Sequence, residues 1–225
     1  MAGRIEDYAI IADTKTVALV ERGGSIDWWC VPRIDSGACF AALLGDESNG
    51  RWLLCPDEEI VSVRRWYRHD TLVLETEFET ASGTVAVVDF MAPPDEQSRI
   101  FRIVEGRDGT VPMKMELVVR FDYGSIVPWV NHVPGGQTLV AGGDGLRFHA
   151  GVPVEGEGMK TVASFSCRAD QQVGFSLACY DAQSSPPLPL DAHAARARAE
   201  SWWREWAGRC TYDGEWGDEV LRSLL

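Results

Sequence analysis

The stretch "MKMELVVRF", residues 113–121, decides the fold class of this chain. Apolar side chains alternate along it with Lys114, Glu116 and Arg120. Because successive side chains of a β-strand point to opposite faces, this period of two predicts a strand with one buried face and one solvated face. The residues expected on the buried face are Met113, Met115, Leu117, Val119 and Phe121.

The same period continues on both sides of this stretch. "TLVLETEFE" (71–79) and "TVAVVDF" (84–90) are separated by "ASG" and predict a hairpin. In the first of these strands the expected inward residues are Leu72, Leu74 and Phe78, and the expected outward residues are Glu75, Glu77 and Glu79. Other strand candidates are residues 15–21, 25–31, 50–55, 60–67, 99–105, 137–142, 145–150, 161–167 and 173–180. About a dozen short strands predict a mainly β chain built as a large antiparallel β-sandwich.

The pattern changes at "DAQSSPPLPLD", residues 181–191, where the prolines end any strand ladder and predict an extended linker. Asp191 is placed to cap a helix that ends near Gly208. Apolar side chains recur in this helix at helical spacing, which predicts a docking face. They are Ala195, Ala199, Trp202, Trp203 and Trp206.

The last residues, "GDEVLRSLL" (217–225), form a second short amphipathic pattern. A helix this short needs a surface to pack on, so we interpret it as the start of a further domain that is cut short. The expected organisation is a sandwich domain over residues 1–182, a linker with the tryptophan-rich helix over 183–210, and the first helix of that further domain over 211–225.

Composition narrows the functional classes. The 225 residues carry 34 acidic and 21 basic side chains, a formal charge of −13 that disfavours nucleic acid and anionic membranes as partners. The six cysteines show no CxxC spacing, and the four histidines are dispersed, so we expect buried free thiols, no metal site and no cofactor. With no targeting segment or long apolar run, the chain is expected to be cytoplasmic.

"GGSIDWWCVPRIDS", residues 23–36, gathers residue types that are common in active sites. The glycine pair predicts a hairpin turn into the following strand. If that strand is regular, Ile26, Trp28 and Cys30 share one face, while Asp27, Trp29 and Val31 share the other. One tryptophan then points outward, either to stack on a sugar ring or to be covered by another domain.

Acid chemistry is a further interpretation of this stretch. Glycoside hydrolysis needs two carboxylates flanking the scissile bond, and Asp27 and Asp35 are candidates by neighbourhood. Turn capping or solvation is the alternative for these two aspartates, and Arg33 could pair with Asp35 in the loop.

Longer segments carry a family resemblance. Residues 5–54, "IEDYAIIADTKTVALVERGGSIDWWCVPRIDSGACFAALLGDESNGRWLL", resemble the start of bacterial members of glycoside hydrolase family 15, the glucoamylase-like and trehalase-like proteins. The resemblance continues in "YRHDTLVLETEFETASGTVAVVDFMAP" (67–93), "VPMKMELVVRFDYGSIVPWV" (111–130), "GEGMKTVASFSC" (156–167) and "WWREWAGRCTYDGEWGDEVLRSLL" (202–225).

The resemblance implies an N-terminal β-supersandwich, helical linker segments and a catalytic (α/α)6 barrel that hydrolyses α-glucosidic bonds with inversion. Its two catalytic glutamates lie in the barrel, so no residue here is matched to them, and the barrel is the expected partner. The resemblance does not decide between trehalase and glucoamylase. In this interpretation the substrate rim or the domain interface includes Asp27, Trp28, Trp29, Arg33 and Asp35, and the docking helix presents Trp202, Trp203 and Trp206.

Two alternatives remain open at this point. The chain could be a stand-alone carbohydrate-binding sandwich for α-glucan or trehalose, using an exposed row of aromatic residues. Candidates for such a row are Trp52, Trp66, Tyr67, Tyr123 and Trp129. The chain could also self-associate through an uncovered apolar helix face.

Overall fold

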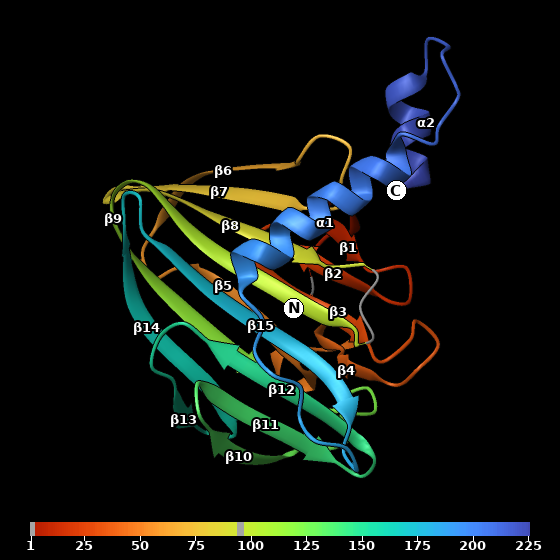
Figure 1. Cartoon of the computed structure of the whole chain (residues 1–225). Helices are drawn as coiled ribbons and strands as arrows, with labels where there is room; N and C mark the ends of the chain where they lie inside the picture. Colours follow the sequence, from red (N-terminus) through yellow and green to blue (C-terminus); the bar gives the residue numbers. More distant parts are fainter. Residues whose placement is uncertain (1–2, 94–96) are drawn as a thin grey trace.

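The computed structural model describes residues 3–93 and 97–225. Within these ranges, fifteen antiparallel strands form one hydrogen-bonded sheet that folds over on itself into two layers (Figure 1). The expected mainly β antiparallel sandwich is therefore confirmed.

The first layer contains most of the N-terminal strands. Its members are β1 (Tyr8–Ala12), β2 (Val17–Glu21), β3 (Ser25–Cys30), β4 (Ala38–Phe40), β5 (Arg51–Pro56), β13 (Glu155–Glu157) and β14 (Lys160–Arg168). The second layer contains β6 (Ile60–Tyr67), β7 (Leu74–Thr80), β8 (Gly83–Met91), β10 (Trp129–Val133), β11 (Gly136–Ala141), β12 (Asp144–Ala150) and β15 (Gln172–Asp181).

Strand β9 (Arg99–Val118) belongs to both layers. Its first half pairs with β8 and β15, whereas its second half pairs with β5 and β14. The sequence predicted two separate strands here, and that expectation is wrong. The pairing with β8 shifts register between Thr84 and Val85, which leaves Arg107 as an extra residue in the middle of β9 and bends β9 without ending it.

The main core lies between the two layers. Trp52 of β5 packs edge-on against Phe148 of β12, with ring centroids 5.7 Å apart, and both side chains are fully buried. The alternation predicted for 113–121 is confirmed, because all five inward residues are at most 5% exposed. The fold therefore rests on the period-two pattern that the sequence displays.

Arg102 crosses this core and joins the layers. It pairs with Asp89 of β8 and donates hydrogen bonds to the carbonyl oxygens of Trp52 and Gly24 in the opposite layer. Arg102 and Asp89 are both fully buried, so a charged pair with satisfied hydrogen-bond donors sits within the apolar interior.

Helix α1 (Ala192–Ala207) lies across the outer face of the second layer, over β8, β9 and β15 (Figure 1). The Asp191 side chain accepts a hydrogen bond from the Ala194 amide, and Gly208 follows the helix end, as predicted. The predicted apolar stripe is wrong in part, because the residues that the helix buries repeat every four positions. These residues are Ala195, Ala199, Trp203 and Ala207, whereas Trp202 and Trp206 lie to one side of that line.

Helix α2 (Gly217–Leu224) projects beyond the sandwich near the end of α1 (Figure 1). Arg222 attaches it to the sheet by donating to the Thr71 carbonyl oxygen and by lying 4.3 Å from the centroid of the Tyr67 ring. In the described ranges, neither helix is long and apolar enough to cross a membrane.

Candidate functional site

The residues after the Gly23–Gly24 turn do not alternate regularly. The pairing of β2 with β3 shifts register beside Asp27, so Ile26 and Trp29 both face the core. Trp29 is fully buried and packs against Phe40. The face assignment for a regular strand is therefore wrong for Ile26, whereas Trp28 shares a face with Cys30 and Trp29 shares one with Val31, as predicted. Trp28 is the outward tryptophan.

Asp27 and Asp35 do not face a common site. Asp27 is buried and accepts hydrogen bonds from the hydroxyls of Tyr8 and Ser25. Burial and the contact with Asp27 raise the pKa of the Tyr8 hydroxyl well above its ordinary value. Asp35 instead lies in the exposed loop that follows β3, so the two carboxylates serve different local roles.

Trp28 and the loop after it form an exposed surface. Trp28 is half-buried and packs against Tyr123, with ring centroids 6.0 Å apart. The Tyr123 amide donates to the carbonyl oxygen of Ala38 in β4, which holds the Tyr123 loop against the first layer. Ile34, in the loop that follows β3, is 62% exposed. We call the group Trp28, Arg33, Ile34, Asp35 and Tyr123 the rim surface.

Arg33 and Asp35 form a two-pronged ion pair on the rim surface, with N–O distances of 2.8 and 3.0 Å. The hydrogen bond that Arg33 donates to Asp35 lowers the pKa of Asp35 and raises the pKa of Arg33. The planar pair presents both charges to solvent in a fixed geometry, which suits hydrogen bonding to a polar partner.

A second exposed surface surrounds the end of α1. The Trp202 and Trp206 rings are stacked 5.7 Å apart, and the Trp206 indole nitrogen donates to the Leu224 carbonyl oxygen. Trp206, Trp216 and Leu224 are 40%, 59% and 49% exposed. We call Trp202, Trp206, Trp216 and Leu224 the tryptophan face. Trp203 is excluded because it is buried beneath α1.

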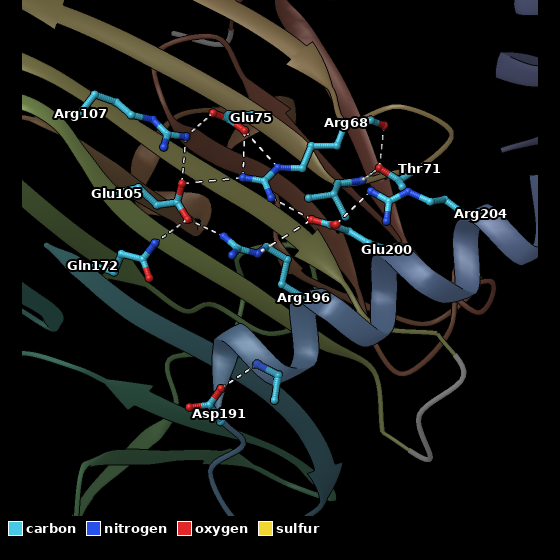
Figure 2. Close-up of polar contacts among 12 residues, drawn as sticks. Arg68, Thr71, Glu75, Glu105, Arg107, Gln172, Asp191, Arg196, Glu200 and Arg204 are labelled. Carbon is cyan, nitrogen blue, oxygen red and sulfur yellow. Dashed lines mark hydrogen bonds and ion pairs between the residues drawn. The ribbon is translucent and has the colours of Figure 1, made fainter. Parts of the chain in front are cut away.

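An ion-pair network fixes α1 on the sheet, as Figure 2 shows. Glu75 of β7 and Glu105 of β9 point outward from the second layer yet are buried by the helix. Arg196 of α1 pairs with Glu105, and Arg107 bridges Glu105 and Glu75. The side chains of Glu75 and Glu105 are thus paired with arginine side chains rather than solvated by water.

Arg68 and Glu200 complete the network on the other side (Figure 2). Arg68 bonds to Glu75 at 3.0 Å and to Glu200 of α1 at 2.8 Å, and Arg204 also pairs with Glu200. Burial raises the pKa of Glu200, but the hydrogen bonds from Arg68 and Arg204 outweigh burial, and its pKa lies below the ordinary value. The amino-acid sequence does not reveal this network, because its members meet only through the tertiary fold. Its one local signal is the i, i+4 spacing of Arg196, Glu200 and Arg204.

The two surfaces offer exposed aromatic and charged side chains for contact with a partner. Among the described residues, no group of three or more histidine, cysteine or acidic side chains is placed to hold a metal ion. Of the aromatic residues considered for a sugar-binding row, Trp52 lies in the core, whereas Tyr123 and Trp129 are 47% and 83% exposed. In the described ranges, the rim surface and the tryptophan face are two of the places where aromatic rings contact one another and remain partly exposed.

Comparison with known proteins adds an independent observation. The family described as "Trehalase-like, N-terminal" matches residues 1–203. Trehalase from Thermoplasma volcanium is 24% identical over 230 residues, which cover 99% of this chain and 37% of that protein. Trehalase from Mycobacterium tuberculosis is 26% identical over 256 residues, which cover 98% of this chain and 36% of that protein.

A shorter similarity has higher identity. Trehalase 2 from Sulfolobus acidocaldarius is 33% identical over 120 residues, which cover 53% of this chain and 19% of that protein. The chain therefore spans little more than a third of the length of the first two relatives.

Proposed function

The chain belongs to the trehalase-like N-terminal family, and from this premise we propose that it is the noncatalytic β-sandwich domain of a trehalase-like α-glucoside hydrolase. The observation that carries the proposal is the match of nearly the whole chain to a part of much longer trehalases. We propose that the parent enzyme belongs to glycoside hydrolase family 15 and carries its hydrolytic glutamates in a catalytic barrel, as the sequence resemblance implies.

In this proposal Trp202 and Trp206 of the tryptophan face dock on the catalytic domain, and Trp216 and Leu224 belong to the first segment of that domain. The exposed indole rings offer a large apolar area with polar tips, the combination that favours protein interfaces. The ion-pair network holds α1 in one position on the sandwich, so the face is presented in a fixed orientation. The sandwich domain spans residues 1–182, the linker and α1 span 183–210, and residues 211–225 begin the catalytic domain.

The rim surface has a separate role. We place the loop from Trp28 to Ser36 beside the mouth of the catalytic barrel, where Trp28 can stack on a sugar or on a neighbouring loop and Arg33 can donate hydrogen bonds. Trp28 takes the role that the sequence analysis divided between two tryptophans, because Trp29 is committed to the core.

The thiols favour a reducing compartment. All six cysteines are free and five of them are buried, which is the usual state of cytosolic proteins. We therefore place the protein in the cytoplasm.

A domain replacement tests the docking role. This chain would replace the matched region of the trehalase from Mycolicibacterium smegmatis, to which it is 27% identical over 249 residues. We expect the hybrid to hydrolyse trehalose and to unfold at a higher temperature than the remaining part of that trehalase alone. Trp206→Ala should weaken both effects, whereas Glu155→Gln on β13 should not. Equal activity and stability with and without this chain would refute the proposal.

A further inference from the structure

Strand β10 lies at an open edge of the second layer. Among the described residues it pairs with β11 alone, and Figure 1 shows it at the lower end of that layer. Its residues are exposed or half-buried, and Trp129 is the most exposed of them. A strand edge presents unpaired backbone N–H and C=O groups that another strand can bind. The edge of β10 is therefore a place where a further strand can join the sheet.

Other strands of the described ranges that have a single partner are covered at their outer edges by the chain itself. In β1, the Tyr67 hydroxyl hydrogen-bonds to both the amide and the carbonyl oxygen of Ile10. In β4, the carbonyl oxygens of Ala38 and Cys39 accept hydrogen bonds from backbone amides of the loop at 120–123. These two edges are thus occupied.

Charge and short length protect two further edges. β6 carries Arg64 and Arg65, and β13 is only three residues long and carries Glu155 and Glu157. Charged side chains and short edge strands are the usual means by which sheet edges are kept apart. β10 has no such charge, because residues 123–143 include no aspartate, glutamate, lysine or arginine. Depletion of charge is typical of the core of a protein interface.

The outward backbone groups of β10 belong to Val130 and His132. Val133 and Gly136 flank a two-residue turn, so they form the first hydrogen-bonded pair of the β10–β11 hairpin. Because antiparallel pairing alternates between residues that bond to the partner strand and residues that do not, the groups of Val130 and His132 point away from β11. The preceding outward position is Pro128, which has no N–H. The free edge therefore offers two complete residues for pairing.

This edge is complementary to itself. When two copies meet through a two-fold axis at Asn131, Val130 of each chain lies opposite His132 of the other, and all outward groups of both residues gain hydrogen bonds. On the other face of the sheet, Trp129 of one chain lies opposite Val133 of the second chain, which covers the exposed ring. Two chains of formal charge −13 repel each other, so an uncharged strand is the surface through which they approach most easily.

We propose that β10 pairs with β10 of a second copy of this chain, so that the second layers of the two sandwiches join into one continuous sheet. The pairing is antiparallel, is centred on Asn131, and rests on backbone hydrogen bonds of Val130 and His132. The interface is small, so the dimer is weak and forms at high protein concentration. It does not involve the tryptophan face, and its failure would leave the proposed function intact.

Analytical ultracentrifugation of the 225-residue chain tests the pairing. We expect a monomer–dimer equilibrium with a Kd on the order of 100 μM. Raising the salt concentration from about 0.05 to about 0.5 M should tighten the dimer, because salt screens the repulsion between two acidic chains. Val130→Pro removes an outward N–H, leaves the hydrogen bonds between β10 and β11 in place, and should raise the Kd roughly tenfold or more. Trp206→Ala is the control on the tryptophan face and should leave the Kd unchanged.

Charged substitutions at the two-fold axis identify the partner strand. Asn131 of one chain faces Asn131 of the other, so Asn131→Asp and Asn131→Lys should each weaken the dimer through repulsion between like charges. An equal mixture of these two variants should dimerise again, because opposite charges then face each other. Asn131→Ser is the uncharged control and should retain the dimer. Asn131 is exposed, so we expect all three variants to unfold in urea at nearly the wild-type midpoint.

Three outcomes would overturn the proposal. They are a chain that stays monomeric well above the expected Kd, a dimer that Val130→Pro does not weaken, and a mixture of the two charged variants that stays monomeric. Loss of the dimer in Trp206→Ala would also overturn it, since self-association would then occur through α1.

Discussion

Arg68 joins the sandwich to α1 through Glu200, with 2.8 Å between the Arg68 Nη1 and Glu200 Oε1 atoms. The two side chains are only 23% and 16% exposed, and both make further ion pairs. Because the pair lies in a partly dry interface, removing one partner leaves the other charge poorly solvated.

Arg68→Met should therefore lower the free energy of unfolding by on the order of 2 kcal/mol, as measured by urea denaturation. Arg209→Met is the matched control, because Arg209 pairs with Glu205 in an exposed position on the same part of the chain. We expect the control to change stability by at most about 0.5 kcal/mol. Equal effects of the two variants would show that the network does not hold α1.

The pH dependence of stability offers a second check on the network. The pKa of Glu200 is held below its ordinary value, so this carboxylate stabilises the fold above the unfolded-state pKa of about 4.3. That contribution is lost as the pH falls through the folded-state pKa. The stability difference between the wild type and Glu200→Gln should thus be full at pH 7 and shrink as the pH falls below about 4. A difference that stays constant from neutral to acidic pH would contradict this assignment.

The adjacent tryptophans of β3 should respond very differently to truncation. Trp29→Ala removes a fully buried ring from the core and should cost about 3–5 kcal/mol of unfolding free energy. Trp28→Ala removes a half-buried ring from the rim surface and should cost about 1 kcal/mol. Urea unfolding of both variants measures this contrast, and a larger cost for Trp28→Ala would mean that β3 faces the other way.

Thiol reactivity provides a further test of the packing. Burial raises the pKa of the Cys179 thiol to about 11, and the Cys39 pKa is raised well above its ordinary value for the same reason. Cys210 is the one cysteine that is partly exposed among the six. At pH 7 a disulfide reagent should label one thiol rapidly, and Cys210→Ser should abolish that fast phase. Several fast thiols in the folded chain would contradict the described core.

The sequence predicts the sandwich well because a period of two is a local signal, and burial does alternate in the second half of β9. It does not reveal which of Trp28 and Trp29 points inward, since one register shift beside Asp27 exchanges their faces. Nor does it reveal the partners of Glu75, because Arg68, Arg107 and α1 come together only through the tertiary fold. The period of two correctly predicts that Glu75 points outward. It cannot predict that α1, over 100 residues away in the chain, buries this side chain.

The same distinction applies to the candidate surfaces. The absence of charged residues over 123–143 is visible in the sequence, but only the strand order shows that β10 lies at an edge. Arg33 and Asp35, by contrast, are close in the sequence, and the loop does pair them as expected.

The most direct test of the central claim is a glucose-release assay of the isolated 225-residue chain with trehalose, maltose and maltotriose. The account predicts no glucose above the buffer blank, because the proposed function puts the hydrolytic carboxylates in another domain. Measurable turnover that a single carboxylate substitution abolished would contradict it, since the chain would then be a catalyst in its own right.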